Sequence, residues 1–214
     1  MAARNRAGTE RETGRLEAFS DGVFAIAVTL LVLELRAPLP TDLHEGERLW
    51  EALWHEWPAY LAFATSFATI LIMWVNHHNL FALIKRVDHA FLLLNGLLLA
   101  TVTIIPFPTN VLAEYIREPD ARTAAIFYAA TFLAMAIAFN RLWWYAQRGR
   151  RLLDPDVDPA LIRMLNRQFG IGPLTYVVAL IIAALHPVAG FLVVMALAVY
   201  WALPEGRRPG RKES

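Results

Sequence analysis

The chain has 214 residues, of which 57% are hydrophobic and 18% charged, and its mean hydropathy is +0.41. A soluble globular chain carries about 45–50% apolar and about 25% charged residues, so this composition disfavours a soluble domain. There is no cysteine, which excludes disulfides and thiolate chemistry.

Six apolar segments are each long enough to approach the roughly 20 residues that a helix needs to cross a bilayer. They cover residues 16–35, 57–74 with a polar extension to 79, 89–107, 124–144, 169–185 and 188–203. Pro106 and Pro108 are expected to end the third segment, and His186 and Pro187 leave a tight turn before the sixth. The first segment is too long for a cleaved signal and is expected to remain as a helix. The sequence therefore predicts an all-α integral membrane protein with six transmembrane helices.

The basic residues predict the orientation of these helices. With the N-terminus in the cytoplasm, 16 of the 20 Lys and Arg residues fall on the cytoplasmic side, as the positive-inside rule requires. The acidic residues instead dominate the opposite loops. Both ends are therefore expected in the cytoplasm, with an N-terminal segment at 1–14, a membrane domain at 15–203 and a tail at 204–214.

The first helix presents two faces. At about 100° per residue, Thr29, Leu30 and Leu33 fall within about 60° of Ile26 around the helix axis. Ser20 and Asp21 lie more than about 100° from Ile26, so they face other helices. An aspartate in a membrane helix costs about 2.5–3.5 kcal/mol at the bilayer centre and marks a functional or structural network.

Simpler interpretations exist for these residues. A stripe of Ile, Thr and Leu is commonly ordinary helix packing, and a threonine hydroxyl such as that of Thr29 commonly bonds a carbonyl three or four residues back. Ser20 or Asp21 could cap the start of a helix.

Asn76 and His77, at the cytoplasmic end of the second helix, are expected at the depth of Asp21. One of them, or Asn95 of the third helix, is predicted to join a network with Arg15, Ser20 and Asp21. A metal site is the alternative for the histidines. Adjacent histidines point about 100° apart on a helix, so no metal is expected.

Several of these motifs resemble one known family. They are Arg15, Phe19, Ser20 and Asp21 followed by Gly-Val-Phe-Ala-Ile-Ala-Val-Thr-Leu-Leu-Val-Leu-Glu34, then Trp74-Val-Asn-His-His78, Asn95 and Pro106-Phe-Pro108. The first-helix motif is long and specific. Over most of residues 15–110 the chain resembles the single-repeat prokaryotic members of the transmembrane protein 175 potassium channels.

The resemblance implies a homotetramer in the cell (inner) membrane, with four first helices lining a central pore. It implies an apolar constriction at Ile26, a potassium-selective hydroxyl ring at Thr29 and a further apolar layer at Leu33, with Leu30 beside them. Arg15, Phe19, Ser20 and Asp21 match the motif that locks the helices around the pore.

The function expected first is therefore a leak-type, potassium-selective channel without a cofactor, whose only ligands are permeant potassium ions. The alternative is a secondary transporter or proton-coupled carrier that uses Asp21 as its proton site. An enzyme is not expected, because the polar residues of the spans do not form a catalytic set. No nucleotide-binding loop is visible, and no nucleic-acid partner is expected.

Overall fold

A computed structural model describes residues 2–41, 43 and 48–202, with side chains from Thr13 onward. The predicted tail at 204–214 and the last residue of the predicted membrane domain lie outside the described residues. The described chain is helical, with one isolated antiparallel β-bridge.

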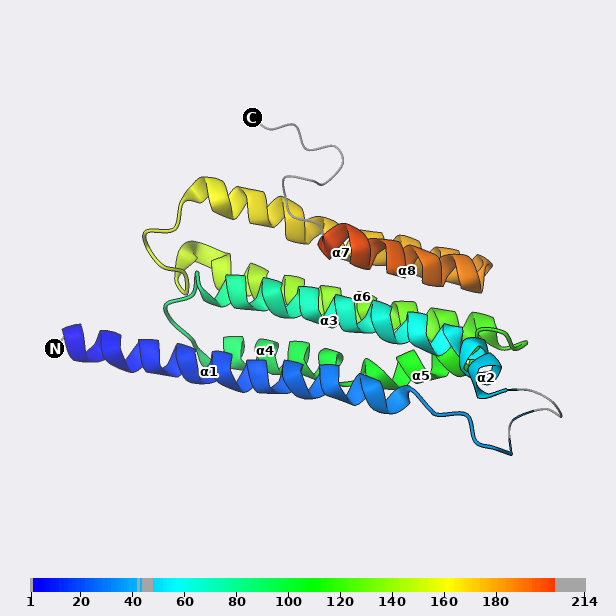
Figure 1. The fold of residues 1–214 in the computed structure, drawn as a ribbon. Helices are drawn as coiled ribbons and strands as arrows, with labels where there is room; N and C mark the ends of the chain where they lie inside the picture. Colours follow the sequence, from blue (N-terminus) through cyan, green and yellow to red (C-terminus); the bar gives the residue numbers. More distant parts are fainter. Residues whose placement is uncertain (1, 42, 44–47, 203–214) are drawn as a thin grey trace.

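The helices follow one another along the chain with short connections (Figure 1). Their bounds are α1 Ala2–Leu30, η1 Leu31–Glu34, α2 Leu49–His55, α3 Trp57–Phe81, α4 His89–Thr103, α5 Pro106–Tyr115, α6 Ala121–Gln147, η2 Arg148–Arg150, α7 Pro159–Leu185 and α8 Pro187–Ala202. In the described part of the chain, five helical stretches are long and apolar enough to cross a membrane, and α8 is a shorter apolar helix of 16 residues. The prediction of an all-α membrane protein with several long apolar helices is confirmed.

The predicted end of the third span is wrong. Pro106 and Pro108 do not end it; they occupy the start of α5, which continues the span to Tyr115. A proline has no N–H, but the first turn of a helix leaves that group unbonded, so proline fits there. The span is thus two stacked helices, α4 and α5, with a break at Ile104 and Ile105.

The predicted start of the fifth span is also wrong, because α7 begins ten residues earlier, at Pro159 rather than Phe169. The Asp158 carboxylate accepts a hydrogen bond of 2.7 Å from the Ala160 amide, and Pro159 occupies the first helical position. Arg163 and Arg167 led the sequence analysis to place this stretch outside the span, although charged residues are compatible with a helix that extends past the bilayer.

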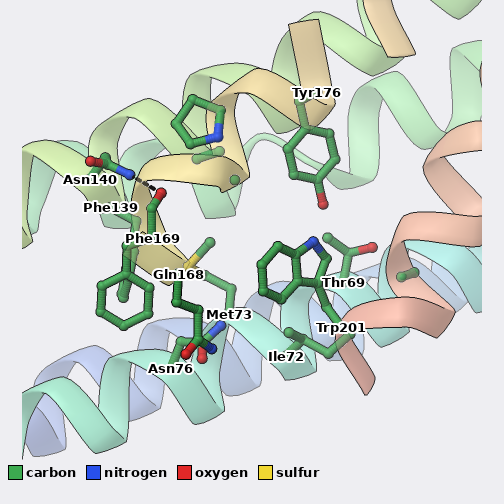
Figure 2. Close-up of a pocket in the computed structure, with 14 residues that line it drawn as sticks. Thr69, Ile72, Met73, Asn76, Phe139, Asn140, Gln168, Phe169, Tyr176 and Trp201 are labelled. Atoms are coloured by element: carbon green, nitrogen blue, oxygen red, sulfur yellow. Dashed lines mark hydrogen bonds between the residues drawn. The ribbon is translucent and has the colours of Figure 1, made fainter. Parts of the chain in front are cut away.

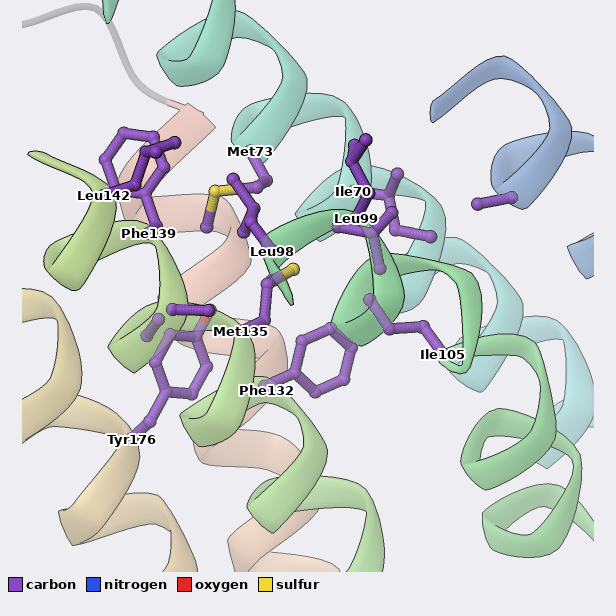
Figure 3. Packing of buried hydrophobic residues seen from close by; sticks show 14 of the residues in the cluster. Ile70, Met73, Leu98, Leu99, Ile105, Phe132, Met135, Phe139, Leu142 and Tyr176 are labelled. Carbon is purple, nitrogen blue, oxygen red and sulfur yellow. The ribbon is translucent and has the colours of Figure 1, made fainter. Parts of the chain in front are cut away.

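The core lies where α6 packs against α4, α5, α7 and α8, with α3 on its flank and α1 at one edge of the bundle (Figure 1). Leu98, Phe132 and Met135 are fully buried at its centre, beside Ile70 of α3 (Figure 3). Within the subunit, the helices that α1 packs on are α3 and α4. One long side of α1 is therefore left without a partner in the subunit.

The connection between α3 and α4 is fixed to the connection between α6 and α7. Ile84 and Leu153 form the antiparallel bridge, and the amides of Lys85 and Arg86 both donate to the Leu152 carbonyl. These backbone bonds hold the two predicted cytoplasmic loops together.

Candidate functional site

The free side of α1 carries the residues predicted to line a pore. Ile26, Leu30 and Leu33 are exposed by 58%, 37% and 71% in the subunit, and Thr29 is exposed as well. Phe19, which was expected to help lock the helix packing, is 63% exposed in the subunit. We call Ile26, Thr29 and Leu30 of α1, together with Leu33 of the η1 turn that continues it, the free edge of α1. In water such a row of apolar side chains would be unfavourable, so the edge must meet lipid, another subunit or a narrow pore.

The opposite side of α1 is tightly packed. Ser20, Phe24, Ala27 and Leu31 recur at three- and four-residue spacing, and each is at most 2% exposed. This spacing places them on one helical stripe. The predicted division of the helix into two faces is thus present in the fold, with Ser20 on the packed face and Ile26 on the free one.

The Thr29 hydroxyl donates a hydrogen bond of 2.9 Å to the Ile26 carbonyl. Its hydrogen is therefore directed back along the helix, as the plainer interpretation of this residue expected. The lone pairs of Oγ1 remain free on the exposed side. The hydroxyl can thus accept from a water or contact a cation while its own donor is satisfied.

Three buried polar side chains join α1, α3 and α4, and we call Ser20, His77 and Asn95 the buried polar cluster. His77 Nε2 lies 2.9 Å from Asn95 Oδ1, Asn95 Nδ2 donates to Ser20 Oγ over 3.0 Å, and Ser20 Oγ donates to the Leu16 carbonyl over 2.8 Å. An amide oxygen can only accept, so His77 Nε2 is the donor to Asn95. Each side chain in the series therefore donates to the next, from His77 to Asn95, to Ser20 and finally to the Leu16 carbonyl. His77 Nδ1 is left without a hydrogen bond among the described residues.

Asp21 has a different partner from the ones the sequence analysis considered. The Trp74 indole Nε1 donates to Asp21 Oδ1 over 2.8 Å. The His78 ring stacks on Trp74 at 6.1 Å, and its Nδ1 lies 3.0 Å from the Glu17 carboxylate. Trp74 was not expected as this partner. The signal that could have indicated it is an indole donor within an apolar span, one turn before His77 and His78.

Two predicted network members lie apart from these clusters. Arg15 is exposed and makes no hydrogen bond or ion pair with side chains in the described part of the chain. Asn76 is half-buried and lines a cavity between α3, α6, α7 and α8. It points away from α1 because it is one residue, about 100°, from His77.

Neither a metal centre nor a catalytic set is formed by these groups. Within the residues described, no three His, Asp or Glu side chains come together in a way that could hold a metal ion. His77 is bonded to Asn95 and His78 to Glu17, on different sides of α3. The geometry is that of a helix held by polar bonds on one side and left open on the other.

Comparison with known proteins connects this arrangement to ion channels. Residues 15–106 match a family model described as the endosomal/lysosomal potassium channel TMEM175. A potassium channel of Chamaesiphon minutus is 51% identical over 91% of this chain and 95% of its own length, and one of Streptomyces collinus is 49% identical over 77% and 79%. The human endosomal/lysosomal proton channel TMEM175 is 36% identical over 61% of this chain and 27% of its own.

Solved structures agree with the sequence relatives. The crystal structure of a lysosomal potassium-selective channel TMEM175 homologue from Chamaesiphon minutus superposes with a TM-score of 0.83, at 49% identity over 90% of this chain and 97% of that one. The protein is thus an integral membrane protein of an ion channel class, not an enzyme. The chain belongs to the TMEM175 family, as the first-helix motif predicted.

Proposed function

We propose that the chain is one subunit of a homotetrameric, potassium-selective leak channel in the cell membrane, with four copies of α1 around the pore. The observation that carries the proposal is the free edge of α1, which is exposed in the subunit while the opposite face is packed and hydrogen-bonded. One helix per subunit cannot enclose a pore, so several copies must surround it. Two relatives that cover most of the chain are named potassium channels.

The proposed constriction is a ring of Ile26 side chains. Leu30 and Leu33 are proposed to form further apolar layers toward the C-terminal end of α1 and η1. A narrow apolar ring resists hydrated ions, because methyl groups cannot replace the water that an ion must shed. The 58% exposure of Ile26 in the subunit leaves its side chain available to such a ring.

The proposed selectivity element is a ring of Thr29 hydroxyls one turn further along the helix. Because each hydroxyl hydrogen is bonded to the Ile26 carbonyl at 2.9 Å, the oxygen lone pairs are the groups that can face the pore. Oxygen dipoles of this kind can replace part of a hydration shell. Potassium gives up its water more readily than sodium, so a modest preference for potassium follows.

The buried polar cluster and the Asp21–Trp74 bond are proposed to hold α1 in position for this role. They anchor α1 to α3 and α4 from the side away from the free edge. With the termini in the cytoplasm, these bonds lie in the cytoplasmic half of the channel, and most of the basic residues remain on that side.

The test is ion flux through the purified full chain in liposomes, compared for potassium, sodium and caesium, with Thr29→Ala beside the wild type. A channel gives currents proportional to driving force, with a potassium preference that Thr29→Ala reduces. A carrier that uses Asp21 would instead saturate, depend on a coupling ion and lose transport in Asp21→Asn. Flux that is equal for potassium and sodium and unchanged in Thr29→Ala would refute the selectivity element.

A further inference from the structure

The two sides of α6 near its C-terminal end have different characters. On the inner side, Phe139 and Asn140 line a small space in the bundle, and the Asn140 amide donates to the Phe169 carbonyl of α7 (Figure 2). The outer side carries four exposed residues at intervals of four, three and four positions: Ile137, Arg141, Trp144 and Arg148. These intervals place them on one helical stripe that runs along α6 into η2.

An open groove of about 690 Å³ lies along this stripe, where α6 packs on α4. Its lining includes Leu94 of α4 and, from α6 and η2, Arg141, Trp144, Tyr145 and Arg148. Among the described residues, no acidic side chain lines this groove, so its two arginines give it a net positive charge. A groove of this charge between membrane helices is suited to an anionic group.

The arginines at this end of α6 divide into two pairs. Arg150 donates to backbone carbonyls of the loop that follows, and Arg151 lies 3.0 Å from the Asp88 carboxylate. Both are therefore used by internal contacts. Arg141 and Arg148, which line the groove, form no ion pair or side-chain hydrogen bond within the described part of the chain. Their charge is available to a ligand.

The position of the groove along the span places it near the lipid headgroups. The apolar stretch Ala121–Arg150 has 30 residues and is therefore about 45 Å long, close to the thickness of a bilayer with its headgroup layers, about 40–45 Å. Arg148 then lies in a headgroup layer, and Arg141, about 14 Å from the end of the stretch, lies just inside the hydrocarbon. An arginine there extends toward the interface and needs a polar partner. Trp144, between the two in the sequence, is of the residue type enriched at this level.

We propose that this groove binds the headgroup of an anionic phospholipid, whose phosphate accepts from the guanidinium groups of Arg141 and Arg148. The planar guanidinium can donate two parallel hydrogen bonds to phosphate oxygens. The acyl chains pack on Leu94 and on Ile137, which lies one turn deeper on the exposed stripe. A zwitterionic headgroup fits less well, because its cation meets the arginines. The site is within one subunit and does not rest on the channel function proposed above.

The test is native mass spectrometry of the purified full chain in detergent, titrated with phosphatidylglycerol or with phosphatidylcholine of the same acyl chains. We expect phosphatidylglycerol to be retained on each subunit with an affinity at least tenfold above that of phosphatidylcholine. Equal retention of the two lipids would overturn the proposal. Inorganic phosphate in large excess should not displace the lipid; displacement would identify a soluble anion as the ligand and would equally overturn it.

Two double variants separate the groove from the overall charge of the protein. Arg141→Gln with Arg148→Gln should lower the affinity for phosphatidylglycerol at least tenfold. Arg163→Gln with Arg167→Gln on α7 removes the same charge from the same predicted side of the membrane, and both residues are exposed but do not line the groove. This control should bind phosphatidylglycerol like the wild type. An equal loss in the two double variants would show that the lipid responds to net charge and not to the groove.

A second measurement locates the lipid without changing the arginines. Bromine atoms on the acyl chains of a lipid quench the fluorescence of nearby tryptophans. In phosphatidylcholine liposomes, a small fraction of brominated phosphatidylglycerol should quench the protein more than the same fraction of brominated phosphatidylcholine. This excess should disappear in Trp144→Phe and remain in Trp54→Phe, because Trp144 lines the groove and Trp54 lies on α2, away from it. If the excess remains in Trp144→Phe, the lipid is bound elsewhere and the proposal is wrong.

Discussion

The side-chain amide of Asn95 donates to the Ser20 hydroxyl over 3.0 Å and thereby joins α4 to α1 across 75 positions of the sequence. Asn95 is 1% exposed and Ser20 is fully buried. The same amide accepts from His77 over 2.9 Å, so one side chain satisfies groups on two other helices. Its removal leaves His77 Nε2 without an acceptor and Ser20 Oγ without a donor, although the Ser20 hydroxyl still donates to the Leu16 carbonyl.

Asn95→Ala should therefore lower the free energy of unfolding by about 1–2 kcal/mol, since hydrogen bonds between membrane helices are worth about 0.6–2 kcal/mol and buried unpaired groups add to the loss. The measurement is the thermal unfolding midpoint of the purified protein in detergent. Asn76→Ala is the matched control, because Asn76 lies on the cavity side of α3 and has no hydrogen bond with described residues. An equal shift for the two variants would show that the buried polar cluster is not specifically stabilising.

A second buried polar group connects α3, α5 and α6. Ser66 Oγ lies 2.8 Å from Thr109 Oγ1 and 2.9 Å from the Tyr128 hydroxyl, and all three residues are at most 2% exposed. Ser66→Ala should lower the unfolding free energy by about 1–2 kcal/mol, because the Tyr128 hydroxyl loses its partner in an apolar core. Combining Ser66→Ala with Tyr128→Phe should be less destabilising than the sum of the single changes. If the losses of the two single variants simply add up in the double variant, the Ser66–Tyr128 hydrogen bond is not the cause of the lost stability.

The α7–α8 hairpin depends on a close approach at Gly190. A Cβ built on this glycine would lie 2.4 Å from the Cα and Cβ of Ala183. Small residues allow membrane helices to approach in this way, so Gly190→Val should force the helices apart and strongly reduce the yield of folded protein and its thermal midpoint. Gly96→Val is the control, since no atom lies within 4 Å of its added Cβ. If Gly190→Val is no worse than Gly96→Val, the close packing is not essential.

Much of this fold could be predicted from the sequence, because long apolar segments and the sided distribution of basic residues are strong signals. Of the candidates for a network with Arg15, Ser20 and Asp21, Asn95 and His77 form hydrogen bonds that lead to Ser20, while Asp21 is bonded to Trp74 instead. The family assignment is confirmed by relatives that cover most of the chain. Roles at Ile26, Thr29, Leu30 and Leu33 in a pore stay predictions, because one subunit shows only that this edge is free.

Other features could not be read from the sequence for identifiable reasons. Pro106 begins α5 after α4 has ended at Thr103. A proline at such a position can end a span or continue it, and the sequence does not show whether the chain keeps its direction there. The bond from Trp74 to Asp21 requires the relative rotation of α1 and α3, which periodicity does not give.

Stability should also depend on pH through Asp88, which caps α4 outside the membrane span. Partial burial raises the pKa of this carboxyl, but the hydrogen bonds from the Phe91 amide and the Tyr145 hydroxyl and the charge of Arg151 outweigh it, so the pKa lies below its ordinary value. A lowered pKa means that the stabilisation is present at neutral pH and is lost as pH falls below about 4. The thermal midpoint should decrease over that range.

Asp88→Asn should remove this part of the pH dependence and lower stability at pH 7 by about 0.5–1 kcal/mol, a small value because the side chain is about one-third exposed. Asp156→Asn is the control, because Asp156 has an exposed side chain in the same group of loops. The thermal midpoint of each protein is measured from pH 7 to pH 3. If the fall of the thermal midpoint at low pH is the same in Asp88→Asn as in the wild type, other carboxylates cause it.

The proposed constriction is tested by making one ring of side chains polar. Ile26→Asn places four amides where the pore is proposed to be narrowest, so water should enter the ring and ion flux should rise severalfold. Val178→Asn on α7 is the matched control, because Val178 is 53% exposed against 58% for Ile26 and α7 does not pack on α1. Flux is measured in liposomes at equal protein density, with unfolding midpoints to establish that both variants are folded. If Ile26→Asn conducts no more than Val178→Asn, the Ile26 side chain does not form the constriction, and the narrowest part of the path must be sought at Leu30 or Leu33.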